Sequence, residues 1–582
     1  MRWKVLAVLG LVLPALCLRA NVAAETLPPR AEWLPQDAVI VMEVSEPKAL
    51  LDLALGDKIK SLVTSSPPWK QQTSQPGFQQ FHQVIRYVEA TLNTDWETAL
   101  RKLVGGGMTS ATMPDGASVL IVDAQDEKML QKLNEFALAA AKSEAAKRGT
   151  AAAAPKERRG VTVYSLGGAD AHALIGSRLV LANRRAALDA VLDQRANPQG
   201  KSVAALPAYQ EARKAADPSA AFMYVNLEVL KRLPQVQKAL DRGENPMAAL
   251  LFGGIQDALR GANWLAMGLR VEGTTLLLSA VTGGMAVDTS GLTGFTWPGP
   301  NQGALPNLAV PGRLAAISMY RDLHGFYAAK DKLFPERTSG LIFFENMMGI
   351  FFSGKDFTEE VLGQLDPEVR LVVAEQKYDP AIGTPNLKIP SFAAVFRLKD
   401  PKKFTEVAEE AWQKALGLIN FTRGQKALPG LIIDRPSYGE TRFSVAYFSA
   451  VGEKDRKNVD MRFNFRPALA QWGDYLIMSS TEGLTKDLID ALKKETAQSA
   501  KAISQTHSLV DIDVTQIASA LAANRDAMVR QNMVEKGASR QQAETNIDLL
   551  ITALKAAGQV TLDMGSRDGR TRASVKVKLN LN

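Results

Sequence analysis

The sequence predicts an α+β protein of two homologous halves, each a mostly antiparallel β-sheet with helices packed mainly on one face. Three observations predict this. Short apolar strands alternate with amphipathic helices, several strand pairs are joined by tight glycine turns, and one unit of the chain occurs twice. That unit, a glycine turn, a strand, a polar cap and a helix, reads GSRLVLANRRAALDAVL at 176–192 and GDYLIMSSTEGLTKDLIDAL at 473–492. Because the strands alternate only weakly between apolar and mixed residues, we expect one sheet face to be covered and the other partly solvated.

Residues 1–24 have the pattern of a secretory signal peptide. Arg2 and Lys4 precede an apolar run at 5–18, and Val22-Ala23-Ala24 forms a small-residue cleavage site after Ala24. The run is too short to cross a bilayer as a helix, since about 20 residues are needed. We therefore expect a periplasmic or secreted chain with no transmembrane span after cleavage. An uncleaved anchor is the alternative, and lipidation at Cys17 is disfavoured by Leu16.

Charge and cysteine content limit the functional classes. Cleavage removes three basic residues and no acid, so the formal charge falls from +8 to +5. The remaining basic residues are interspersed with acids, and we expect no nucleic-acid partner. Cys17 is the only cysteine, so the mature chain has none and can form neither disulfides nor cysteine-based metal sites.

The first α+β repeat is predicted to span 25–292. Ser45-Glu46-Pro47 is interpreted as the cap of a helix, Gly105 to Gly107 as the end of another, and Asp126 as the start of a third. Residues 65–76 are expected to be a loop, and residues 142–160 a helix end followed by an exposed loop. The predicted strands are 38–44, 117–122, 161–166, 178–182, 222–227, 265–271 and 275–281, with 161–166 and 178–182 paired as a hairpin; the predicted helices are 78–103, 127–141, the segment after Asn183, and those within 228–261.

Residues 293–312 are predicted to be a Pro/Gly linker, because four prolines and four glycines in twenty residues disfavour regular structure. The second repeat, 313–582, then presents the same order of elements. Its predicted strands are 314–320, 392–398, 443–448, 475–479, 509–514, 560–564 and 573–577, and Asp356-Phe357 corresponds to Asp95-Trp96. Seven correspondences in one order favour an ancient duplication.

Four segments resemble one bacterial protein family. They are LPQDAVIVMEVS, the 176–192 unit with the residue after it, KSVAALPAYQEARKAADPSAAFMYVNL and GLRVEGTTLLLSAVTG, and the resemblance is clearest over 34–282. The family comprises exported envelope proteins known only as a domain of unknown function. The resemblance implies export and an α+β fold. It implies no catalytic, cofactor or metal residues.

No motif predicts a catalytic or metal site. The four histidines, His82, His172, His324 and His507, lie in different predicted elements, without the spacing of metal ligands. Ser45 and Lys48 match the S-x-x-K pattern of penicillin-recognising enzymes, but the companion motifs are missing and a helix cap is preferred.

Three other features have an ordinary and a functional interpretation. Gly105 to Gly107 form either a helix end, which is preferred, or an anion-binding nest. Asp511 and Asp513 share one face of a strand, as solvated acids or as a carboxylate pair. The apolar stretch GLIFFENMMGIFF, 340–352, is interpreted first as a buried core helix and second as an apolar groove or membrane-facing patch.

These observations leave three functional hypotheses. The leading one is a non-catalytic binding or scaffold protein of the envelope, with no catalytic, cofactor-binding or metal residues and an unknown envelope protein as its partner. The alternatives are a carrier of lipid or another apolar ligand, and a hydrolase with carboxylates gathered from both halves.

Overall fold

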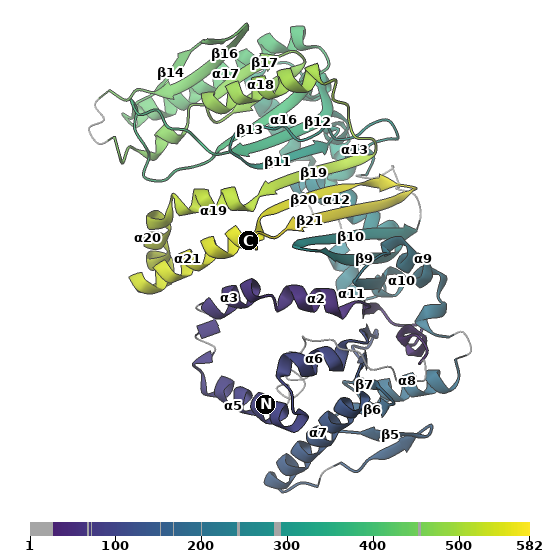
Figure 1. Ribbon diagram of the computed structural model, residues 1–582. Coiled ribbons are helices and arrows are strands. Elements are labelled where there is room, and N and C mark those ends of the chain that lie inside the picture. The colour runs from purple at the N-terminus through teal and green to yellow at the C-terminus, as the bar shows by residue number, and fades with distance from the viewer. Residues whose placement is uncertain are drawn as a thin grey trace. The chain divides into compact units, whose positions relative to one another are not determined.

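The computed structural model describes residues 27–66, 69–70, 73–151, 153–166, 168–198, 201–240, 245–284, 293–451 and 456–581 (Figure 1). The predicted signal peptide, 1–24, lies outside the described residues. The chain divides into two units. Unit 1 comprises the described residues within Met1–Asp241 and Ala262–Met285, and unit 2 those within Arg242–Gly261 and Ala286–Asn580.

The described strands of unit 1 form one antiparallel sheet. Their order across the sheet is β4-β5-β6-β7-β3-β2-β1-β8-β9-β10. Their bounds are β1 (Ile40–Val44), β2 (Met108–Thr112), β3 (Ser118–Asp123), β4 (Lys156–Arg158), β5 (Val161–Tyr164), β6 (Ala171–Ile175), β7 (Arg178–Ala182), β8 (Ala221–Asn226), β9 (Ala262–Glu272) and β10 (Thr275–Gly284).

The described strands of unit 2 have the same order. From one edge they run β14 and β15, then β16-β17-β18-β13-β12-β11-β19-β20-β21, again all antiparallel. Their bounds are β11 (Arg313–Tyr320), β12 (Leu365–Ala374), β13 (Ser391–Leu398), β14 (Leu431–Asp434), β15 (Ser437–Tyr438), β16 (Thr441–Phe448), β17 (Ala468–Trp472), β18 (Tyr475–Ser479), β19 (Thr506–Asp513), β20 (Gln559–Arg567) and β21 (Arg570–Lys578). In both units the first strand therefore lies inside the sheet. It pairs on one side with the second strand (β2 or β12) and on the other with the strand before the C-terminal hairpin (β8 or β19).

Many of the helices occupy corresponding places between these strands in the two units. Those among the unit 1 residues are η1 (Arg30–Trp33), α2 (Pro47–Ala54), α3 (Asp57–Ser65), α5 (Pro76–Leu92), α6 (Trp96–Val104), α7 (Glu127–Lys147), α8 (Arg185–Ala196), η2 (Val203–Ala205), α9 (Pro207–Ala216), α10 (Leu227–Leu230) and α11 (Pro234–Leu240). Those among the unit 2 residues are α12 (Pro246–Gly261), α13 (Thr293–Thr296), α14 (Leu323–Ala328), α15 (Lys330–Leu333), η3 (Pro335–Arg337), α16 (Thr338–Phe351), η4 (Phe357–Val361), η5 (Leu362–Gln364), α17 (Pro401–Gln425), α18 (Glu482–Ala497), η6 (Met461–Asn464), α19 (Val514–Ala522), α20 (Arg525–Lys536) and α21 (Arg540–Ala557).

The expectation that helices cover mainly one sheet face is wrong. In β3, Val119 and Ile121 belong to the core beneath α8 and α9, whereas Val122 belongs to the core beneath α6 and α7. In unit 2, Ile477 of β18 packs with α18, and its neighbour Leu476 packs with α17. Successive side chains of a strand point to opposite faces, so helices lie on both faces of each sheet. The weak alternation of apolar residues reflected this double burial.

The two predicted glycine turns are confirmed, but one predicted pairing of strands is wrong. Gly176 (φ +58°) and Gly473 (φ +54°) both occupy the left-handed region in the turns before β7 and β18. Residues 161–166 and 178–182, however, do not form a hairpin, because β6 lies between β5 and β7. Strands β2, β6, β12 and β17 were not predicted from the sequence.

The predicted linker at 293–312 is packed into unit 2. Leu308 and Val310 belong to its main core, and the backbone of Ala304 bonds with Ile503 and Thr506. Helix α12, predicted within the first repeat, also groups with unit 2, where Ala249 packs on Phe326 and Phe334. The units therefore do not divide the chain at a free Pro/Gly segment.

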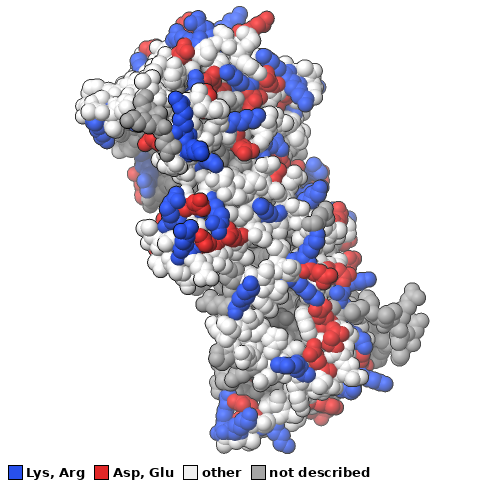
Figure 2. All heavy atoms as spheres, turned by 60° about the vertical axis from the view of Figure 1, so that its left-hand side comes forward, with Lys and Arg blue, Asp and Glu red and all other residues white. Residues whose placement is uncertain are grey.

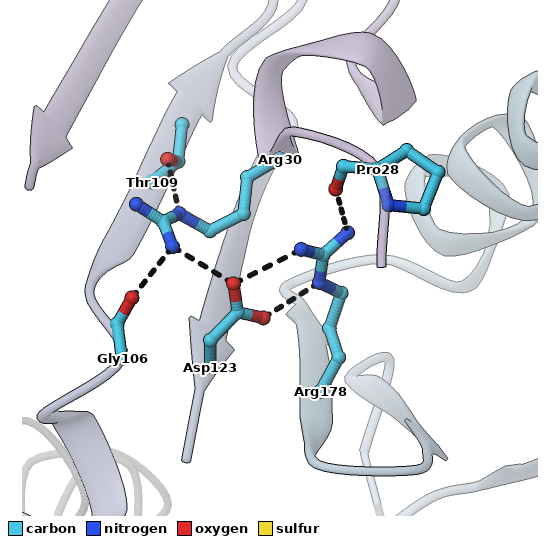
Figure 3. Close-up of polar contacts among 6 residues, drawn as sticks. All are labelled: Pro28, Arg30, Gly106, Thr109, Asp123 and Arg178. Carbon is cyan, nitrogen blue, oxygen red and sulfur yellow. Dashed lines mark hydrogen bonds and ion pairs between the residues drawn. The ribbon is translucent and has the colours of Figure 1, made fainter. Parts of the chain in front are cut away.

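A buried ionic cluster fixes the segment that leads into unit 1 (Figure 3). Asp123, at the end of β3, accepts hydrogen bonds from Arg178 Nε (2.6 Å) and Nη2 (2.9 Å) and from Arg30 Nη1 (2.8 Å). Arg178 also donates to the carbonyl of Pro28 (2.8 Å) and lies over the ring of Trp33. Since only 2% of the Arg178 side chain is exposed, this guanidinium depends on Asp123 for its neutralisation.

We expect Asp123→Ala to lower the free energy of unfolding by about 3 kcal/mol, because it leaves Arg178 buried without its carboxylate. The double variant Asp123→Leu with Arg178→Met should lose less, since it removes both charges. Urea denaturation measures both.

The matched control is Asp115→Ala, whose partner Arg184 is half exposed. It should change stability by no more than about 0.5 kcal/mol. A double variant less stable than Asp123→Ala would contradict the assignment of Asp123 as the required counter-ion.

Candidate functional site

An apolar cavity of about 80 Å³ lies within unit 1, between three helices and the sheet. Its wall is formed by α5, α6 and α7 on one side and by β3 and β7 on the other. Fourteen of its fifteen lining residues are apolar: Val84, Ile85, Val88, Trp96, Ala99, Leu100, Leu103, Val104, Leu120, Val122, Leu130, Leu133, Leu179 and Leu181; the other is Glu89.

Helix α6 forms the largest part of the wall because its sequence is sharply amphipathic. Asp95 caps it by accepting a hydrogen bond from the Thr98 backbone N–H (2.8 Å), and the bonds from Thr98 lower the pKa of Asp95. Leu100 and Leu103 then face the cavity. On the other side of the helix Arg101 pairs with Asp52 of α2.

The other two helices complete the wall in the same way. Asp126 caps α7 through the Met129 backbone N–H (3.0 Å), which places Leu130 and Leu133 over β3. In α5, Val84 and Val88 line the cavity one turn apart, and Val84 is 40% exposed. The cavity therefore reaches the surface along α5.

The chemistry of this cavity is that of an apolar binding site. Its one carboxylate, Glu89, accepts a hydrogen bond from the Trp96 backbone N–H (2.9 Å). The volume is about half that of an engineered apolar cavity that stays dry and binds benzene, which is ~150 Å³. Among the described residues, no three His, Cys, Asp or Glu side chains gather as a metal site would require.

Unit 2 has a cavity of a different kind, about 160 Å³, between α17 and strands β16 to β18. Glu409 is the one acid in its lining. Its carboxylate accepts from Arg435 (2.7 Å) and from the Ser444 hydroxyl (2.9 Å). A single carboxylate held by two donors does not provide the acid and base of a carboxylate hydrolase.

The histidines are placed separately, in unrelated surroundings. His172 contacts Asn134 (2.8 Å), His324 contacts Glu359 (3.2 Å), and His82 lies against Phe78. His507 is buried, with Nδ1 2.8 Å from the Ser508 hydroxyl.

The other sequence candidates have structural roles. Ser45 does not cap α2; its hydroxyl accepts from Arg213 (3.3 Å) and Glu46 precedes the helix. Gly105 to Gly107 form the tight turn from α6 to β2, where the Gly106 carbonyl accepts from Arg30. Asp511 bonds Asn307 and Arg313, whereas Asp513 caps α19, so the two acids do not act as a pair.

The stretch 340–352 forms most of α16, and the preferred interpretation of a buried core helix is wrong. None of its residues is buried, and Phe343 and Ile350 are each 70% exposed. The charged residue of the helix, Glu345, instead turns toward Lys330 (3.3 Å) and Thr358 (2.8 Å). None of the described helices has the length and apolar character to cross a membrane.

The cavity could not be predicted from the sequence because its lining residues are spread over five separate helices and strands. The sequence predicts an amphipathic helix at 78–103, yet the same apolar stripe would arise for a fully packed helix. Only the positions of α5 and α7 on β3 leave the space open. The dense apolar residues of α5 and α6 were the one available sign.

Comparison with known proteins identifies no family for this chain. No family model matches the sequence and no curated protein matches it, so the resemblance over 34–282 stays a prediction. Among solved structures, crystal form I of TP0453 aligns with 45% of this chain and 80% of its own, at 10% identity and a TM-score of 0.24. Crystal form III of TP0453 aligns with 44% and 80%, at 7% identity and a TM-score of 0.23. Scores this low carry no argument about fold or function.

Acid should destabilise the protein through His507. Burial lowers the pKa of His507 well below its usual value, and the Arg321 cation acts in the same direction. Below the unfolded pKa of about 6.5 the unfolded chain binds a proton that the folded chain does not, so stability falls as pH decreases. The slope is at most about 1.4 kcal/mol per pH unit.

Urea denaturation at a series of pH values between neutral and mildly acidic measures this effect. His507→Gln should flatten the dependence, while His172 keeps a smaller contribution because burial also lowers its pKa. An unchanged slope in His507→Gln would contradict the assignment.

Proposed function

We propose that this chain is an exported, non-catalytic binding protein of the bacterial envelope that holds an apolar ligand in unit 1. The observation that carries the proposal is the cavity beneath α5, α6 and α7, with its fourteen apolar lining residues. Transfer of hydrocarbon from water into such a lining is favourable, and its one polar side chain, Glu89, is already bonded to the Trp96 backbone N–H. This joins the leading hypothesis of a binding protein with the alternative of an apolar carrier.

Duplication is part of the proposal. The strand order of the two units agrees from the edge strands to the C-terminal hairpin, and the turn-strand-helix unit recurs as β7-α8 and β18-α18. Duplication of one ancestral sheet explains the shared strand order more simply than the independent origin of two sheets. Export rests on the apolar run at 5–18 and the small residues before Ala24.

Surface charge supports an uncharged ligand over a polyanionic one. Lys and Arg are interleaved with Asp and Glu over the face shown in Figure 2, with uncharged areas between them. The exposed apolar side of α16, with Phe343, Met347 and Ile350, is a second surface that would gain from contact with lipid or an apolar partner.

Nile red, an uncharged apolar dye, tests the proposal. We expect the purified mature protein to enhance its fluorescence, and Ala99→Phe to weaken binding by about tenfold or more, because the ring fills the cavity. Leu100→Ala should retain binding, since it enlarges the same cavity. A fluorescence titration with each variant provides the affinities.

Ala90→Phe is the matched control, because Ala90 lies on the exposed side of α5 and does not line the cavity. A second control, Phe343→Ser, should reduce any binding of the dye to the exposed apolar side of α16. Equal binding by Ala99→Phe and Ala90→Phe, with both variants folded by circular dichroism, would exclude the cavity as the site.

A further inference from the structure

The sheet face that lines the unit 1 cavity continues beyond it as a row of uncharged side chains. Leu181 and Leu120 line the cavity and are directly paired across β7 and β3. Leu120 pairs with Ser110, and Ser110 pairs with Met42. Directly opposed residues of an antiparallel pair share one face, so the row crosses the sheet from the cavity outward.

Methionines extend the row over the next strands. Met42 pairs with Met223 of β8, and Met223 pairs with Met267 of β9. Met42 is 51% exposed and the other two are partly exposed. Methionine is flexible and polarisable, and is used where one surface must fit chains of varied shape.

The surroundings of the row are also uncharged. On β1 the same face carries Ile40 and Val44, and on β9 it carries Leu265 and Leu269. The charged residue of β1, Glu43, points to the opposite face, where it binds Tyr209. The open face therefore continues the cavity wall as a surface without charged side chains.

Unit 2 presents the same arrangement at corresponding strands. Met478, Ala394 and Leu371 are paired across β18, β13 and β12, and Leu371 pairs with Ile317 of β11. Met478 is 41% and Leu371 36% exposed. A row of uncharged side chains at the same place in both sheets argues that it is a property of the fold rather than an accident of one strand.

The dimensions favour a long chain. Neighbouring strands lie about 4.8 Å apart, so the distance from β3 across β2 and β1 to β8 is about 14 Å. One leaflet of a bilayer core is about 15 Å thick, which is the reach of one acyl chain. A chain seated at Leu120 would therefore extend to Met223.

We infer that the ligand of unit 1 is a long unbranched hydrocarbon chain, one end in the cavity and the rest lying over Ser110, Met42 and Met223. The inference rests on the proposed function and adds the class of ligand, an acyl-chain lipid. Continuity with the cavity wall is what assigns the open face to this occupant.

Competition between Nile red and uncharged alcohols tests it on the full mature protein. Hexadecanol should displace the dye far more effectively than hexanol. Met223→Gln and Met42→Gln should each weaken the binding of hexadecanol by about fivefold and leave the binding of hexanol unchanged, because only the long chain reaches these side chains. Met247→Gln, on the exposed surface of α12, is the control and should change neither.

The outcomes separate the two proposals. If hexanol displaces the dye but hexadecanol gains nothing from its length, or the methionine variants have no effect, the long-chain inference is overturned and the cavity proposal stands. If neither alcohol displaces the dye, the cavity proposal fails as well. A dimer in light scattering that Met223→Gln dissociates would assign the face to a second copy and overturn the inference.

Discussion

The two-sidedness of the antiparallel sheet is the constraint on which the rest of this structure depends. Each strand sends alternate side chains to opposite faces, and several inner strands, such as β3 and β9, carry apolar side chains on both faces. On one face Val41, Phe222 and Trp264 are buried with α8 and α9 in a closed core. On the other, α5 to α7 cover only the end near β3 and β7. The cavity and the open apolar row are both consequences of this unequal cover.

Buried arginines anchor the segments that lead into each sheet. Arg178 binds Asp123 and the carbonyl of Pro28, and Arg370 of unit 2 binds Glu495 and the carbonyl of Pro306 (3.4 Å). Each of these arginine side chains is 2% exposed. A buried ion pair of this kind contributes little net stability, but removal of one partner is costly. These clusters therefore specify the path of the lead-in segment more than they strengthen the fold.

Much of the α+β organisation could be predicted locally. The strands at 38–44, 117–122 and 509–514 have high β-propensity, and Asp126 caps its helix as expected. The helix predicted at 78–103 is instead two helices, because Asp95 caps a new one. The strand β2, Met-Thr-Ser-Ala-Thr, was missed because its small and polar residues have no strand pattern and it is held by β1 and β3 on either side. The packing of 293–312 was missed because composition disfavours regular elements without indicating whether a segment is buried.

The sequence by itself determined local features: the glycine turns at 176 and 473, the helices after them, and the strands with a clear apolar pattern. These depend on backbone conformation and on neighbours along the chain, so a local pattern is sufficient. Only the tertiary structure decided which apolar faces are covered. Leu120, Met42 and Phe343 are equally apolar in the sequence, yet one lines a cavity, one lies on an open sheet face and one faces solvent on α16. Their exposure depends on contacts between residues far apart in the chain, which no local pattern records.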